Sequence, residues 1–213
     1  MEKSVRNISE ELARKLLQIK AIKLSPQNPF TWASGIQSPI YCDNRIVLSH
    51  PEVRNFVIQH LSDLSHSFGE FDTVAGVATA GIAHGALVAN HLNKPFIYVR
   101  SKAKGHGRQN LIEGEVKSGA KVLVIEDLIS TGGSSLQAVE ALREATCEVV
   151  GVVAIFSYGF DRAQEAFNTA NCPFTTLTTY PVLLEAAQAS QYINREDVIS
   201  LQNWRKAPEQ WKQ

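Results

Sequence analysis

The sequence predicts an α/β fold with a parallel β-sheet at its core. Between residues 71 and 156, short and almost wholly apolar segments alternate with segments of helical periodicity. Strands that are apolar throughout are buried on both faces, as in parallel sheets whose crossover helices cover each side. Turns rich in small residues follow two of the apolar segments, at the end of a strand where such sheets bind their ligands. Together these observations predict one sheet with helices packed on its faces.

The elements of this core follow from the apolar runs. Strands are expected at 73–78, 95–99, 121–125, 148–156 and 174–178. Helices are expected at 82–92 and 134–144, each after a turn that contains glycine. The loops at 79–81, 100–108 and 126–135 follow strands, so we expect them to share one edge of the sheet.

The part of the chain before the core is expected to form a small addition to it. A helix is predicted over 9–19, where leucine and isoleucine recur at helical spacing. Short strands are expected at 30–32 and 39–42, and a further helix begins after Pro51. No internal repeat divides the chain. We expect a single domain over 1–213, composed of an N-terminal part at 1–70, the core at 71–180 and a C-terminal segment at 181–213.

The composition excludes several classes of protein. Formal net charge is zero, with 21 acidic and 21 basic side chains, which argues against the broad positive surface of nucleic-acid-binding proteins. No stretch is apolar for long enough to span a bilayer, and the polar N-terminus does not read as a secretory signal. The three cysteines are far apart, and the six histidines lack metal-ligand spacing. We expect a cytoplasmic protein with no nucleic-acid or membrane partner and no metal site built from protein ligands alone.

The segment 122–135 carries the most chemistry. An apolar strand leads to two adjacent carboxylates, Glu126 and Asp127, and a Thr-Gly-Gly-Ser turn then opens a helix. Glycines let successive N–H groups converge at a helix N-terminus, which favours a phosphate, and two carboxylates can hold a sugar diol. The alternative is an ordinary strand–turn–helix junction in which Ser134 is the N-cap and the acids are solvated. The segment lacks the Gly-Lys-Ser/Thr of a nucleotide P-loop.

This segment resembles the phosphoribosyl pyrophosphate signature of the type I phosphoribosyltransferases, and the resemblance extends over 71–156. It implies that the two acids bind the ribose hydroxyls and that the loop holds the 5-phosphate. It also implies that Ser130 contacts the base. The substrate-binding residues that it implies here are Glu126, Asp127, Leu128, Ile129, Ser130, Thr131, Gly132, Gly133 and Ser134.

Two further segments resemble the branch of this family that uses orotate. The stretch 30–45 contains Ser-Gly-Ile-Gln-Ser-Pro and is similar to the base-binding segment of those enzymes. The stretch 100–107 is similar to their mobile catalytic loop, in which Arg100, Lys104 and His106 would meet the pyrophosphate. By charge alone, such a basic loop is more simply a solvated charge run. The resemblance assigns the catalytic roles to Lys104, His106 and Asp127.

The resemblance implies a type I phosphoribosyltransferase fold with an N-terminal base-binding hood. It implies transfer of ribose 5-phosphate from phosphoribosyl pyrophosphate to orotate, with Mg²⁺ as cofactor, in a homodimer with shared active sites. The chain departs from the family at Ala33, Ala80 and Ser101, where lysines are frequent. Two other functions stay open: a phosphoribosyltransferase for a purine or another base, and a regulator that senses phosphoribosyl pyrophosphate without catalysis.

Overall fold

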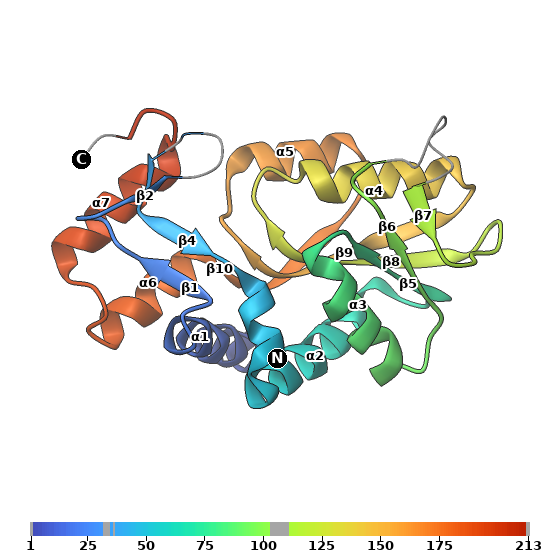
Figure 1. Ribbon diagram of the computed structural model, residues 1–213, viewed down its shortest axis with the longest axis horizontal. Coiled ribbons are helices and arrows are strands. Elements are labelled where there is room, and N and C mark those ends of the chain that lie inside the picture. The colour runs from blue at the N-terminus through green and yellow to red at the C-terminus, as the bar shows by residue number, and fades with distance from the viewer. Residues whose placement is uncertain (1, 32–34, 36, 103–110, 212–213) are drawn as a thin grey trace. The chain divides into compact units, whose positions relative to one another are not determined.

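The computed structural model describes residues 2–31, 35, 37–102 and 111–211, and it divides the chain into two compact units (Figure 1). One unit, called here the core unit, is formed by residues 54–177. The other, called here the flanking unit, combines residues 1–53 with 178–213. No helix among the described residues is long and apolar enough to cross a membrane.

The core unit is built on a mixed sheet with the strand order β10-β9-β8-β5-β6-β7 in the described part of the chain. Its strands are β5 (Thr73–Val77), β6 (Phe96–Val99), β7 (Ile112–Glu113), β8 (Lys121–Ile129), β9 (Glu148–Ser157) and β10 (Phe174–Thr179). Strands β6, β5, β8 and β9 pair in parallel, whereas β7 pairs antiparallel with β6 at one edge. The predicted α/β fold with a largely parallel sheet is therefore confirmed.

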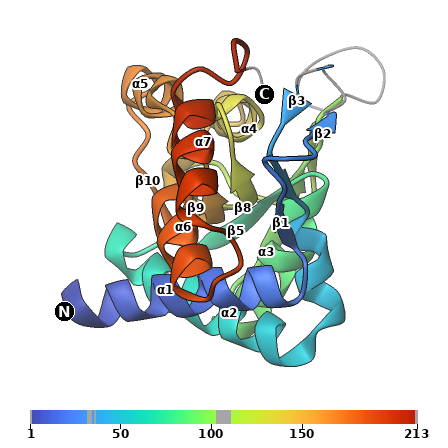
Figure 2. The same ribbon diagram turned by 90° about the vertical axis from the view of Figure 1, so that its left-hand side faces the viewer.

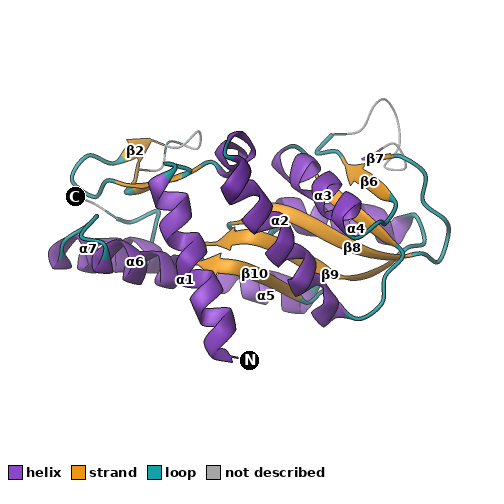
Figure 3. Cartoon of the chain, turned by 90° about the horizontal axis from the view of Figure 1, so that it is seen from below, coloured by secondary structure: helices purple, strands orange, loops and turns teal. Residues whose placement is uncertain are grey.

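Helices cover both faces of this sheet. On one face lie α2 (Pro51–Ser65) and α3 (Ala80–His91), and on the other lie α4 (Gly133–Glu144) and α5 (Asp161–Thr169) (Figure 3). The central strands are buried on both sides, because Val122 to Ile125 of β8 have no exposed surface. Burial of each such side chain favours folding by about 1.5–3 kcal/mol.

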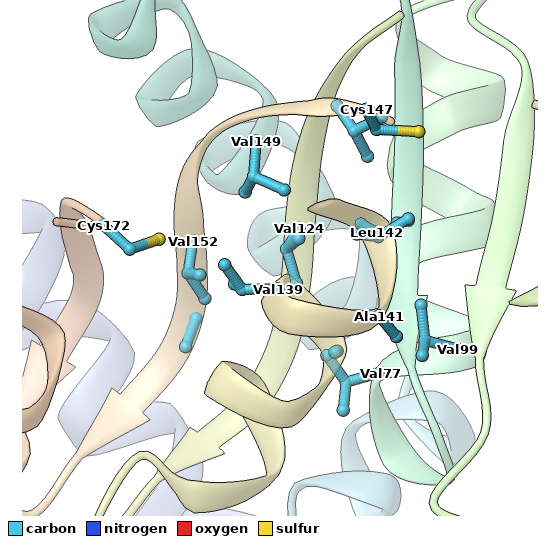
Figure 4. Packing of buried hydrophobic residues seen from close by; sticks show 14 of the residues in the cluster. Val77, Val99, Val124, Val139, Ala141, Leu142, Cys147, Val149, Val152 and Cys172 are labelled. Carbon is cyan, nitrogen blue, oxygen red and sulfur yellow. The ribbon is translucent and has the colours of Figure 1, made fainter. Parts of the chain in front are cut away.

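The core on the α4 side is made of small branched side chains from neighbouring elements. Val124 of β8 and Val152 of β9 lie beside Val139 and Leu142 of α4 in one buried cluster (Figure 4). The buried residues of α4 include Ser135, Ala138, Val139 and Leu142, which recur at the spacing of one helix face. This packing fixes the start of α4 against the end of β8.

The flanking unit contains the two ends of the described chain. Helix α1 (Glu2–Gln18) packs on α6 (Tyr180–Ala189), as Figure 2 shows, and α7 (Arg195–Lys206) follows α6. Two small antiparallel pairs join β1 (Ile22–Leu24) to β4 (Ile40–Cys42) and β2 (Phe30–Thr31) to β3 (Gln37–Ser38). Short 3₁₀ turns occupy Asn44–Ser49 and His66–Phe68, the second of them in the core unit.

Most predicted elements are present, but two boundaries near the site were wrong. The strand expected to end at residue 125 continues to Ile129, because β9 pairs with it as far as Ser157. Both acids therefore lie within β8 rather than after it. The loop expected at 79–81 is shorter, since α3 already begins at Ala80. The sequence reading also missed the helices α5, α6 and α7 and the short strands β1, β3 and β7.

Candidate active site

The candidate site lies at the carboxyl end of β8, where the strand turns into α4. The strand carries Glu126 and Asp127 near its end, and α4 begins at Gly133 after a short turn. The amide of Leu136 donates to the carbonyl of Gly132 across 2.9 Å, which closes the first helical turn. Helix geometry leaves the N–H groups before Leu136 without a helical acceptor, so an anion can accept hydrogen bonds there.

Glu126 is the most buried acid of this site, with only 4% of its surface exposed. Its Oε1 accepts from the backbone N–H of Asp127 at 3.1 Å, and its Oε2 accepts from the hydroxyls of Ser134 at 3.1 Å and Ser135 at 3.2 Å. Burial, followed by the charge of the neighbouring Asp127, raises the pKa of Glu126 to about 8. The alternative of solvated acids is therefore wrong for Glu126, whereas Asp127 is half-buried.

The turn between strand and helix depends on one glycine. Gly132 is in the left-handed region at φ 83°, and it is the N-cap of α4. A Cβ at this position would lie 2.8 Å from Cε2 of Phe167, a fully buried residue of α5. The alternative in which Ser134 is the N-cap is therefore wrong, since the hydroxyl of Ser134 is directed to Glu126 instead.

The other predicted residues of the loop differ in how accessible they are. Thr131, Gly133 and Ser134 are exposed, and Ser130 is half-buried. Leu128 is also half-buried, whereas Ile129 has no exposed surface and belongs to the core. A ligand can therefore reach the side chains of Thr131 and Ser134 directly, but not the side chain of Ile129.

A second helix begins beside Glu126. Gly81, in the first turn of α3, lies so near β8 that a Cβ on it would be 2.6 Å from the carbonyl oxygen of Ile125 and 3.5 Å from Oε1 of Glu126. The peptide bond between Ala78 and Thr79 is cis. The sheet edge thus brings the beginnings of α3 and α4 to the two sides of one carboxylate.

Arg100 directly follows β6, another strand of the same sheet. Its guanidinium forms an ion pair with Glu113 of β7, with 3.3 Å between Nη1 of Arg100 and Oε1 of Glu113. The Arg100 side chain is 27% exposed. Of the predicted loop, Ser101 and Lys102 are described and exposed. Lys104 and His106 lie outside the described residues.

The base-binding segment predicted at 30–45 belongs to the flanking unit. The rings of Phe30 and Tyr41 lie 5.7 Å apart, and Nζ of Lys23 lies 5.9 Å from the centre of the Tyr41 ring. Arg45 forms two hydrogen bonds with the carboxylate of Asp43, at 2.7 and 2.8 Å, and this contact lowers the pKa of Asp43. The positive charge of Arg45 is therefore already balanced by the carboxylate of Asp43.

Two residues of the site were absent from the sequence prediction. Ser135 has no exposed surface and contacts Glu126, and Phe167 supports Gly132. A signal for Ser135 does exist in the sequence, because it shares the helical spacing of the buried face of α4. Phe167 gives no such signal, since its contact with Gly132 depends on how α5 packs.

Comparisons with known proteins agree with this geometry. The family model described as "Phosphoribosyl transferase domain" matches residues 45–179, which include the strand, both acids and the turn. The orotate phosphoribosyltransferase of Bacteroides thetaiotaomicron is 56% identical over 208 residues, which cover 97% of this chain and 98% of that protein. The chain belongs to the orotate phosphoribosyltransferase family.

Other members of this family show the same likeness. The orotate phosphoribosyltransferase of Listeria innocua is 53% identical and is covered over 99% of its length, with 96% of this chain aligned. Among solved structures, the orotate phosphoribosyltransferase of Aeropyrum pernix aligns with a TM-score of 0.75 at 27% identity, over 86% of this chain and 99% of that one. The expected type I phosphoribosyltransferase fold is thereby confirmed.

Proposed function

We propose that the carboxyl edge of the core sheet is where this chain binds phosphoribosyl pyrophosphate. As an orotate phosphoribosyltransferase, the chain transfers ribose 5-phosphate from this donor to orotate in pyrimidine biosynthesis, giving orotidine 5′-monophosphate and pyrophosphate. One observation supports the location above all others. The acid pair of β8 and the phosphate-type turn into α4 are joined by the hydrogen bond from Ser134 to Glu126.

Each part of the donor has a matching group in this proposal. The 5-phosphate accepts hydrogen bonds from the N–H groups at the start of α4 and from the hydroxyls of Thr131 and Ser134. The ribose hydroxyls donate to the carboxylates of Glu126 and Asp127. The remaining residues of the turn contact the ligand through backbone groups rather than side chains in this proposal; they are Leu128, Ile129, Gly132 and Gly133.

The chemistry is a displacement at the anomeric carbon of the ribose. A ring nitrogen of orotate attacks this carbon, and pyrophosphate leaves from the opposite face. Bond breaking at a sugar carbon develops oxocarbenium character, while negative charge gathers on the leaving group. Arg100, Lys104 and His106 stabilise that charge in the proposal, because fixed positive groups act most strongly where charge develops. Arg100 would then exchange or share its ion pair with Glu113.

Mg²⁺ is the expected cofactor, and the described residues fit the way this ion usually binds. They contain no cluster of three or more possible metal ligands, and β8 offers the adjacent carboxylates of Glu126 and Asp127. Mg²⁺ is commonly held by substrate phosphates with one or two carboxylates and several waters. When bound, it would neutralise charge on the pyrophosphate, with Asp127 as the accessible carboxylate beside it.

Ser130 of the core unit is proposed to contact the base, and the hood segment of the flanking unit is proposed to contribute a base-binding surface of its own. The rings of Phe30 and Tyr41, together with the cation of Lys23, offer a surface suited to a planar anion.

We further propose a cytoplasmic homodimer in which each active-site loop serves the partner's site. Cys42, Cys147 and Cys172 are free thiols, in keeping with a reducing compartment.

A panel of bases tests the proposal. The purified protein is incubated with phosphoribosyl pyrophosphate and Mg²⁺, and the loss of orotate, uracil, adenine, guanine or hypoxanthine is followed separately. Orotate should be consumed far faster than any other base. A purine as the preferred base would overturn the substrate assignment, and no consumption of any base would favour a regulator.

A further inference from the structure

The carboxylate of Glu126 has two hydroxyl partners that differ in their access to a ligand. Ser134 and Ser135 both donate to the same oxygen, Oε2, at 3.1 and 3.2 Å. Ser134 is exposed at the start of α4, whereas Ser135 has no exposed surface. A phosphate in the turn can therefore take the hydroxyl of Ser134, but it cannot take that of Ser135.

This difference matters because Glu126 is buried. A buried carboxylate is stable only while hydrogen bonds replace the water that it has lost. If a 5-phosphate draws Ser134 away, Glu126 keeps the N–H of Asp127 on Oε1 and the hydroxyl of Ser135 on Oε2. Ser135 is then the partner that fixes the orientation of the oxygen nearest to the turn.

We propose that Ser135 is a positioning residue of this reaction, whose buried hydroxyl holds the Glu126 carboxyl in place for the ribose while the 5-phosphate occupies Ser134. The inference rests on the proposed function, since it takes Glu126 as a ribose ligand and Ser134 as a phosphate ligand. It adds a residue that touches no substrate and acts only through Glu126.

The consequence is a separation of two affinities. Ser134 contributes to binding of the phosphate, and Ser135 contributes only to the additional affinity that the ribose provides. The ratio of the dissociation constants of inorganic phosphate and ribose 5-phosphate measures this additional affinity, and a general loosening of the fold would not change it selectively.

The experiment measures both ligands by calorimetry on the wild type and on Ser135→Ala, Ser134→Ala and Ser135→Thr. Ser135→Ala should bind inorganic phosphate as the wild type does, but ribose 5-phosphate about tenfold more weakly, as expected for the loss of one hydrogen bond. Ser134→Ala should weaken both ligands. Ser135→Thr keeps the hydroxyl and should restore most of the ribose-dependent affinity. Ser62→Ala, which removes another buried serine hydroxyl of the core unit, should change neither ligand.

Several outcomes would overturn the inference. The same ratio of the two constants in Ser135→Ala and the wild type would show that Ser135 does not position Glu126. An equal loss of both ligands would show that its role is general support of the turn. Where Ser135→Ala does not fold, Ser135→Cys provides the same comparison, since a thiol is a much weaker donor of similar size. No base is needed in this measurement, so a failed orotate assay would overturn the proposed function separately.

Discussion

Gly132 of the phosphate turn lies directly against the ring of Phe167, which leaves no room for a side chain between them. A Cβ on Gly132 would be 2.8 Å from Cε2 and 3.2 Å from Cδ2 of this ring. Phe167 is itself fixed, since it has no exposed surface and its ring lies 4.3 Å from that of Phe174 on β10. The conformation of the turn therefore depends on packing against α5, a helix that contributes no predicted site residue.

Gly132→Ala should destabilise the protein by two separate effects. A left-handed backbone costs an alanine about 1–2 kcal/mol. The contact with Phe167 should add about 1–3 kcal/mol, as overpacking of a core does. The matched control is Gly119→Ala, because Gly119 has a similar φ of 77° but nothing within 4 Å of a Cβ. Urea unfolding of both variants separates the effects. Equal losses of stability in Gly132→Ala and Gly119→Ala would show that the ring of Phe167 moves to accommodate the new Cβ without a measurable loss of stability.

The raised pKa of Glu126 predicts how stability depends on pH. Its pKa is about 8 in the folded protein, above the ordinary value of 4.5. Between these two pH values, the carboxyl group keeps its proton in the folded state but has lost it in the unfolded state. Stability contributed by this group is therefore complete below about pH 4.5 and is lost as pH rises to about 8. Glu126→Gln stays neutral and should avoid this loss.

The measurement is the free energy of unfolding of both proteins at several pH values from 5 to 8. The difference in favour of Glu126→Gln should grow with pH, by at most about 1.4 kcal/mol per pH unit. Titrating groups that do not interact with Glu126 cancel in this difference because the two proteins share them, and Asp127, which does interact with it, ionises mainly below this pH range. A constant difference over this range would mean that Glu126 ionises normally in the fold.

The sequence predicted the core sheet well because its strands are apolar throughout and because glycine-containing turns follow them. It placed Glu126 and Asp127 at the right edge of the sheet, but it ended the strand too early at Ile125. Polar residues usually mark the end of a strand, whereas here pairing with β9 carries the strand through the acids. The spacing indicates that Ser135 lies on the buried face of α4, but its contact with Glu126 and the contact of Phe167 with Gly132 depend on three-dimensional packing.

Asp127→Asn should lower kcat/KM for phosphoribosyl pyrophosphate strongly while the protein stays folded. The reason is that an amide replaces a carboxylate that accepts from a ribose hydroxyl, and a hydrogen bond to a charged group typically contributes about 1.5–3 kcal/mol. Steady-state kinetics together with a thermal unfolding midpoint provide the test. Unchanged kinetics in a folded variant would show that other groups hold the diol.

Tyr41→Leu and Lys23→Gln should both raise KM for orotate and leave KM for phosphoribosyl pyrophosphate unchanged. The tyrosine offers a ring for the base, and the lysine beside it offers a charge for the orotate carboxylate. Uracil, which has no carboxylate, separates these roles as a competitive inhibitor. Its inhibition should weaken in Tyr41→Leu but not in Lys23→Gln. Lys20→Gln, which removes an exposed charge nearby, is the control. An unchanged KM for orotate in both variants would exclude this face from the base site.

The proposed homodimer with shared sites predicts that two inactive variants restore each other. Lys104→Ala removes stabilisation of the pyrophosphate, and Asp127→Ala removes a ribose ligand, so neither variant alone should be active. If the loop acts on the partner's site, a mixed dimer contains one site with both defects and one site with none. Mixing should then restore activity to about half of the wild-type value per mixed dimer, as two-fold symmetry requires.

The opposite outcome is equally clear, because a loop that closes over its own subunit leaves one defect in every site of a mixed dimer. Exchange of subunits must be shown independently, by mixing a tagged and an untagged copy and isolating the mixed dimer by its tag. The isolated mixed dimer of Lys104→Ala and Asp127→Ala is then assayed beside a mixed dimer of wild type and Asp127→Ala, which should keep half of the activity under either arrangement. Activity in the second dimer without activity in the first would exclude shared sites. The second dimer shows that mixed dimers form and are active, so an inactive first dimer would mean that each loop serves its own subunit.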